Sequence, residues 1–103
     1  MLILIMEPPS IKFELKSWPN FFNKIITGQK THELRRSDDR EFLIGDQLLL
    51  KEFDPKNQTY TGREAVVEIT YITAALSPCA YSTEALKPGF CILSIKLIQK
   101  PAN

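Results

Sequence analysis

The feature that most constrains this chain is a double change in hydrophobic period around one short segment. Residues 11–16 alternate strictly between apolar and polar side chains, as in a half-buried strand. Apolar side chains then recur at helical spacing, at Trp18, Phe21, Phe22, Ile25 and Ile26. Ser17 is a suitable N-cap, and Gly28 is a suitable residue to end a helix. The pattern therefore predicts one principal helix over residues 18–27, packed through this apolar stripe.

The rest of the chain returns to a period of two. Alternating segments predict further strands at residues 31–36, 46–53, 65–71 and 91–97. Turn-forming residues at 54–62 are typical of a hairpin, and residues 74–88 form the longest connection. One helix among five or six strands, joined mostly by hairpins, predicts an α+β fold in which the helix packs beside a small mixed β-barrel.

Composition limits the classes of function. A chain of 103 residues without an internal repeat or linker is expected to form a single domain, residues 1–103. The formal net charge of +1 gives no overall field that would attract nucleic acid, so any such site must be a local patch. Cys79 and Cys91 lack the close spacing of a zinc site, and Cys91 is expected in the core. We therefore expect a cytoplasmic protein without a metal or cofactor.

The amino-terminal residues 1–10 form an apolar extension of the predicted domain. Met1–Met6 is wholly apolar but far too short to span a bilayer. It also lacks the basic start and the cleavage site of a signal peptide. We expect an ordered strand here, with a ragged leader before Met6 as the alternative, and no membrane partner.

The densest group of polar side chains follows the predicted helix. Glu33 and Arg35 share one face of the predicted strand, and Leu34 lies on the other face with His32. If Leu34 packs into the core, Glu33 and Arg35 form a charged pair beside the helix, within reach of Lys30. Such a cluster suits an anionic or polar ligand. A surface ion pair and a solvated lysine at the helix end are the structural alternatives.

The segment from Gly28 to Arg35 resembles the G-x-K-x-x-E-x-R motif of ASCH domains, relatives of the PUA RNA-binding fold. A wider resemblance, over residues 11–98, is to a subgroup of small bacterial and phage ASCH-like proteins of unknown function. It is carried by Leu15–Phe22, Phe42–Asp46, Lys51–Pro55, Tyr60–Arg63 and Gly89–Leu93. The resemblance implies a PUA-like barrel in which Lys30, Glu33 and Arg35 line a ligand cleft beside the helix.

The function that this resemblance implies is binding of RNA or of a nucleotide. Lys16 lies on the polar face of the first strand, just before the helix, and adds a cation to the cleft. Trp18 is a candidate to stack on a base, although its helical phase favours core packing. Tyr60 and Arg63 flank Gly62 at the hairpin, where they contact either a nucleotide or the turn itself.

Two alternative functions stay open. The first is a hydrolase acting on RNA or on an acylated nucleoside, with Lys30 and Glu33 as candidate catalytic residues. Phe13 stands where the subgroup commonly has a histidine, and Glu33 where the amidohydrolase relatives have a threonine, which disfavours this reading. His32 shares the face of Leu34, which favours a half-buried histidine over a catalytic one. The second is a module that binds a protein partner through the apolar amino terminus and residues 74–88.

Overall fold

The computed structural model of the chain describes residues 10–75 and 81–102. In chain order its elements are β1 (Ile11–Ser17), α1 (Pro19–Ile26), β2 (His32–Arg36), β3 (Gln47–Asp54), β4 (Thr59–Ala74), α2 (Ser82–Ala85) and β5 (Phe90–Gln99). This content, mostly sheet with few helices, confirms the predicted α+β class. The strand predicted at Met1–Met6 and the residue Cys79 lie outside the described residues.

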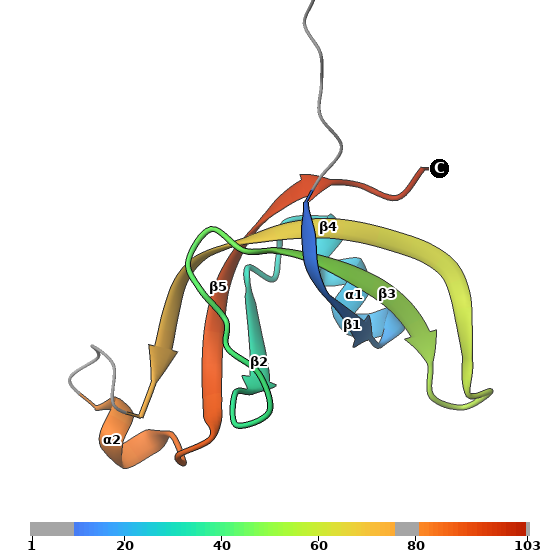
Figure 1. Cartoon of the computed structure of the whole chain (residues 1–103). Helices are drawn as coiled ribbons and strands as arrows, with labels where there is room; N and C mark the ends of the chain where they lie inside the picture. Colours follow the sequence, from blue (N-terminus) through green and yellow to red (C-terminus); the bar gives the residue numbers. More distant parts are fainter. Residues whose placement is uncertain (1–9, 76–80, 103) are drawn as a thin grey trace, which may run out of the picture.

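The five strands form one curled sheet (Figure 1). Their order is β1-β3-β4-β5-β2, so β1 and β2 are its two edges. β1 runs parallel to β3, and the other three neighbouring pairs are antiparallel. The strand count agrees with the prediction. The shape does not, because β1 and β2 do not pair within the described part of the chain, and the sheet is a half-barrel instead of a complete barrel.

The curl has a local cause in β4. This strand has 16 residues and extends the predicted strand 65–71 at both ends. Its pairing with β5 shifts register between Val66 and Val67 and again between Ile69 and Tyr71. Such irregularities bend a strand and increase its local twist. In Figure 1, β4 arches over α1, which places the helix on the concave side of the sheet.

Helix α1 begins slightly later than predicted. Trp18 rather than Ser17 is its N-cap, because β1 continues through Ser17. Pro19 occupies the first helical position, where its missing N–H costs no hydrogen bond. The helix ends at Ile26, and Gly28 follows with a φ of 81°, a backbone conformation that favours glycine.

The core lies between α1 and the concave face of the sheet. Phe22 and Ile25 enter it from the helix, and the strands supply Leu15, Leu48, Leu50, Ala65, Val67, Ile69, Cys91, Leu93 and Ile95. The predicted burial of Cys91 is confirmed, and burial raises the pKa of its thiol. No helix within the described ranges has the length and apolar character needed to cross a bilayer.

Candidate functional site

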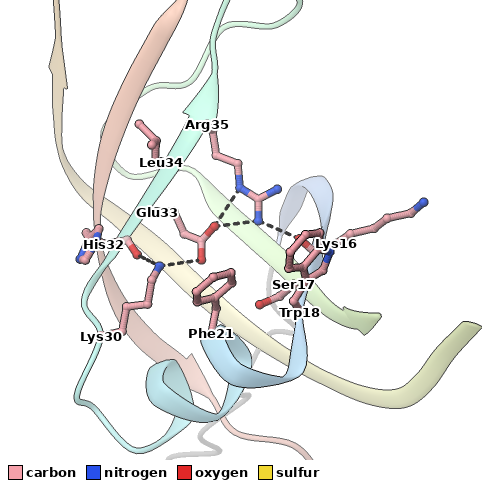
Figure 2. Close-up of a pocket in the computed structure, with 9 residues that line it drawn as sticks. All are labelled: Lys16, Ser17, Trp18, Phe21, Lys30, His32, Glu33, Leu34 and Arg35. Carbon is pink, nitrogen blue, oxygen red and sulfur yellow. Dashed lines mark hydrogen bonds and ion pairs between the residues drawn. The ribbon is translucent and has the colours of Figure 1, made fainter. Parts of the chain in front are cut away.

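A pocket of about 400 Å³ opens where the end of β1, the first turn of α1 and β2 come together (Figure 2). It is lined by Lys16, Ser17, Trp18, Phe21, Lys30, His32, Glu33, Leu34 and Arg35. Five of the seven predicted ligand-binding residues are therefore at this pocket. The remaining two, Tyr60 and Arg63, are not among its lining residues.

Strand β2 directs toward the protein interior the face that was expected to point outward. Glu33 is buried, at 4% exposure, whereas Leu34 is 60% exposed and His32 is also exposed. Figure 2 shows Glu33 and Arg35 on one side of the strand, toward Phe21 of α1, and Leu34 on the other. The expected packing of Leu34 and His32 against the core is therefore wrong. The physical reason is that β2 is an edge strand, with a pocket instead of an apolar layer beneath Glu33.

The buried carboxylate of Glu33 is held by two cations. Arg35 donates from Nε to Glu33 Oε2 at 2.8 Å, and its Nη2 lies 2.7 Å from the same oxygen. Lys30 Nζ lies 3.4 Å from Glu33 Oε1, and it also donates to the backbone carbonyl of His32. A carboxylate this deeply buried needs such partners, because an unpaired charge would be strongly destabilising. The three side chains therefore form a fixed cluster with a net charge of +1, and neither a surface ion pair nor a solvated lysine describes it.

Arg35 also connects the two edges of the half-barrel. Its Nη2 group donates to the backbone carbonyl of Lys16 at 2.8 Å, across the opening between β2 and β1. Within the described residues, the other terminal amino group, Nη1, has no hydrogen-bonding partner. The guanidinium is thus fixed by the protein on one side and can donate to a ligand from the other.

An exposed aromatic pair lies beside this cluster. The rings of Trp18 and Phe21 stack with centroids 6.2 Å apart and planes 16° apart. They are 53% and 48% exposed, so the prediction that Trp18 packs in the core is wrong. Lys30 Nζ lies 5.7 Å from the centroid of the Phe21 ring. The apolar stripe of α1 is therefore divided, with Phe22 and Ile25 in the core and the two rings at the pocket.

Ser17 adds a polar atom to the pocket wall. Its side chain is buried, at 3% exposure, and its Oγ has no hydrogen-bond partner. The prediction that Ser17 caps α1 is wrong. Its side chain points inward from the end of β1, on the same face as Leu15. The Ser17 hydroxyl is therefore an unpaired polar group that is buried at the edge of the pocket.

Comparison with known families places the chain. Residues 12–95 match the family described as Domain of unknown function (DUF3850). The chain belongs to this family. Every residue that lines the pocket falls within the matched part of the DUF3850 domain. A comparison with curated proteins finds no match.

Two predicted site residues of the DUF3850 domain lie near the pocket but outside it. Arg63 donates from Nη2 to Asn23 Oδ1 at 3.1 Å, and its Nη1 lies 3.7 Å from Glu52 Oε2. Tyr60 packs edge-to-face on Phe53, with ring centroids 5.1 Å apart. Arg63 therefore has a structural role in packing, whereas the Tyr60 ring is 49% exposed.

The sequence does not single out four residues that line the pocket, Ser17, Phe21, His32 and Leu34, nor the buried Glu52. The period places Phe21 in the helix stripe and Ser17 at the helix cap, and it offers no signal that would separate them from other residues of the helix. Glu52 is buried, at 3% exposure, and receives a hydrogen bond from Thr61 Oγ1 at 2.6 Å. A signal for Glu52 does exist, because it and its partners Thr61 and Arg63 fall in two of the segments that carry the ASCH resemblance.

The donor set of the pocket does not favour a metal. Within residues 10–75 and 81–102, no three His, Cys, Asp or Glu side chains are grouped so as to hold a metal ion. At the pocket, the single carboxylate is already engaged by Lys30 and Arg35. The arrangement instead offers N–H donors beside flat apolar rings, which suits an organic ligand with a planar ring and an oxygen-rich group.

Proposed function

We propose that this domain binds a nucleotide, free or within an RNA, in the pocket between β1, α1 and β2. We also propose that its fold is PUA-like and of the ASCH type. The segment Gly28–Arg35 that resembles the ASCH motif supports both proposals, since its Lys30, Glu33 and Arg35 all line the pocket. A curled sheet with one principal helix on its concave side is compatible with this assignment.

The observation that carries the proposal is the exposed pair Trp18 and Phe21 beside two fixed cations. Stacking of a base on an aromatic side chain contributes about 1–3 kcal/mol to the free energy of binding. Lys30 and Arg35 supply charge-assisted donors for a phosphate or for a base carbonyl. A nucleotide combines the two features that this pocket can recognise, a flat ring and an anionic group.

The geometry of Glu33 favours binding over hydrolysis. A general base must reach the proton that it removes, but the Glu33 side chain is only 5% exposed and each of its oxygens already contacts a cation. Phe13, at the position of the subgroup's histidine, packs edge-to-face on Phe42 with centroids 5.4 Å apart and does not line the pocket. Hydrolysis of RNA or of an acylated nucleoside is therefore the alternative function, and the turnover experiment described below tests it.

Calorimetric titration with each of the four ribonucleoside 5′-monophosphates tests the proposal. At least one should bind, and Trp18→Ala should weaken that binding by roughly tenfold, the effect of one lost stacking contact. Tyr81→Ala is the matched control, because Tyr81 is a 70% exposed ring outside the pocket. Absence of binding, or equal affinities for Trp18→Ala and wild type, would contradict the proposal.

The same preparations separate binding from catalysis. Incubation with a short RNA and with an acylated cytidine, followed by chromatography of the products, should show no turnover. If the wild type converts either substrate and Glu33→Gln does not, the domain is a hydrolase and the proposed binding role is wrong.

A further inference from the structure

We infer that the ligand is a single-stranded oligonucleotide, which continues from the pocket onto a second surface next to it. This inference rests on the proposed function and names its ligand class. The second surface, here called the lysine–tyrosine surface, consists of Lys16, Lys51 and Tyr60, and the buried ring of Phe53 lies beneath it. It lies outside the set of residues that line the pocket, with the exception of Lys16.

Lys16 belongs to both surfaces. Its backbone carbonyl accepts the hydrogen bond from Arg35 inside the pocket. Its side chain runs away from the Lys30–Glu33–Arg35 cluster, as Figure 2 shows. The Nζ atom lies 4.3 Å from the centroid of the Phe53 ring and 6.0 Å from that of Tyr60. The pocket and the lysine–tyrosine surface are therefore contiguous through this one residue.

Lys51 places a second cation on the same surface. It is the register partner of Lys16 in the parallel pair β1–β3, so the two backbones lie about 4.8 Å apart. Its Nζ atom lies 4.7 Å from the centroid of the Tyr60 ring. Two ammonium groups therefore flank a tyrosine ring that is about half exposed.

The combination repeats the chemistry of the pocket, with cations beside an exposed ring. A free mononucleotide has one base and one phosphate group, which the pocket alone can bind. A single strand presents a base and a phosphate at each step, and proteins that bind such strands combine basic and aromatic side chains along the backbone. A base can reach Trp18 only when it is unstacked, and a single strand allows this without the cost of breaking a base pair.

The ion pair of Lys51 does not prevent this role. Glu14 Oε1 lies 3.3 Å from Lys51 Nζ, and the Glu14 side chain is 61% exposed. Exposed pairs of this kind contribute little to stability, so a phosphate can compete for the lysine. Replacing Glu14 by Gln should therefore strengthen oligonucleotide binding by about two- to threefold.

Competition binding with a fluorescent single-stranded RNA hexamer of mixed sequence tests the inference. Lys51→Ala should weaken hexamer binding by about fivefold. It should also reduce the salt dependence of the binding constant, the slope of log K against log salt concentration, by the amount expected for about one lost phosphate contact. The same variant should bind each nucleoside monophosphate as the wild type does. Lys96→Ala is the matched control, since Lys96 is also paired with a glutamate, Glu68, at 3.8 Å, on a different part of the sheet. Competition with a DNA hexamer of the same sequence shows whether the protein distinguishes ribose from deoxyribose.

The outcomes distinguish the inference from the proposed function. Hexamer affinity that falls in Lys51→Ala and in Trp18→Ala, but not in Lys96→Ala, supports a path across both surfaces. If monophosphates bind and Lys51→Ala leaves hexamer affinity unchanged, the inference is wrong and the proposed function stands. If neither ligand binds the wild type, both are wrong. If the hexamer binds and Trp18→Ala has no effect, the strand does not enter the pocket, and the inference is again wrong.

Discussion

Two glutamates of the sheet are almost equally buried but lie in opposite surroundings. Glu33 on β2 is 4% exposed and Glu52 on β3 is 3% exposed, and each is paired with an arginine. Glu33 and its partner Arg35 line a pocket of about 400 Å³. At Glu52, Thr61 donates at 2.6 Å, and Arg63 places its guanidinium 5.0 Å from the centroid of the Phe22 ring.

The difference teaches that a buried carboxylate does not by itself mark a functional site. The two environments are separated by consecutive residues of α1. Phe21 is 48% exposed and forms a wall of the pocket, whereas Phe22 is fully buried beneath the guanidinium of the second arginine, Arg63, which does not line the pocket. Glu52 therefore connects β3 to β4 and, through Arg63 and Asn23, to the helix. Glu33 holds two cations where a ligand can reach them.

Among the replacements of charged residues, the largest effect is expected from Arg35→Ala. It removes the main partner of a buried carboxylate and the hydrogen bond that links β2 to Lys16 of β1, so the free energy of unfolding should fall by about 3 kcal/mol. Urea denaturation measures this change. Arg36→Ala is the control, because the Arg36 side chain is 64% exposed and its pair with Asp38 contributes little. Equal losses in the two variants would show that Lys30 alone stabilises Glu33.

This expectation corrects the one that follows from the sequence alone. With Glu33 and Arg35 on an exposed face, replacement of Arg35 would change ligand affinity and leave the fold intact. In the structure Arg35 is half-buried and bridges the two edges of the sheet, so its replacement should change both the ligand affinity and the stability of the fold. Lys30→Ala is the cleaner test of ligand binding.

Glu52→Gln should give the next largest effect and sharpen the comparison. The amide keeps the shape of the side chain but lacks the charge that Arg63 faces, so stability should fall by about 2 kcal/mol. Nucleotide affinity should stay within about twofold of wild type, because the hydrogen bond and the ion pair of Glu52 go to Thr61 and Arg63, neither of which lines the pocket. Parallel denaturation and calorimetry check both halves. A large loss of affinity would show that the two carboxylates act as one site.

Lys30→Ala should affect binding more than stability. It removes one donor from the pocket, so nucleotide affinity should fall by about tenfold, or roughly 1.4 kcal/mol. Glu33 keeps its stronger partner Arg35, and the loss of stability should stay below about 1 kcal/mol. Calorimetric titration is the measurement, with Lys24→Ala, an exposed lysine of α1, as the control. The pocket assignment fails if the two lysine variants bind equally well.

The smallest effect is expected from Leu34→Ser, which tests which way β2 faces. Leu34 is 60% exposed, so stability should change by less than about 0.5 kcal/mol. Leu93, the register partner of Glu33, is fully buried, and Leu93→Ala should cost about 2–5 kcal/mol. Thermal or urea unfolding of both variants compares the two leucines. A large loss in Leu34→Ser would mean that Leu34 faces the core after all.

The periodicity of the sequence predicts where the elements lie but not which face of each is covered. The helix and the strands follow from local spacing and turn residues, and the structure confirms them within a few positions, except that β4 begins at Thr59, inside the predicted hairpin connection. A period of two shows that Glu33 and Arg35 share a face, but not whether that face is buried. That depends on β2 being an edge strand beside a pocket, a property of the whole sheet.

Glu52 and Trp18 illustrate two further limits of predicting burial from the sequence. The pairing of β3 with β4 shifts register between Lys51 and Phe53, so Glu52 and its neighbour Phe53 are both buried and no alternation marks them. Trp18 fits the helical stripe by spacing, yet it lies at the N-cap directly after β1, with its ring exposed. In both cases burial is decided by tertiary contacts between segments distant in sequence.

The most direct test of the central claim uses Trp18 itself. It is the only tryptophan in the chain and is 53% exposed at the pocket, so its fluorescence reports on this site alone. Titration with the nucleoside monophosphate that calorimetry selects should quench this fluorescence saturably, with the affinity that calorimetry gives, and Lys30→Ala should shift the curve to about tenfold higher concentration. A nucleotide that binds without changing the fluorescence, or quenching that Lys30→Ala leaves unchanged, would contradict the assignment of this pocket as the nucleotide site.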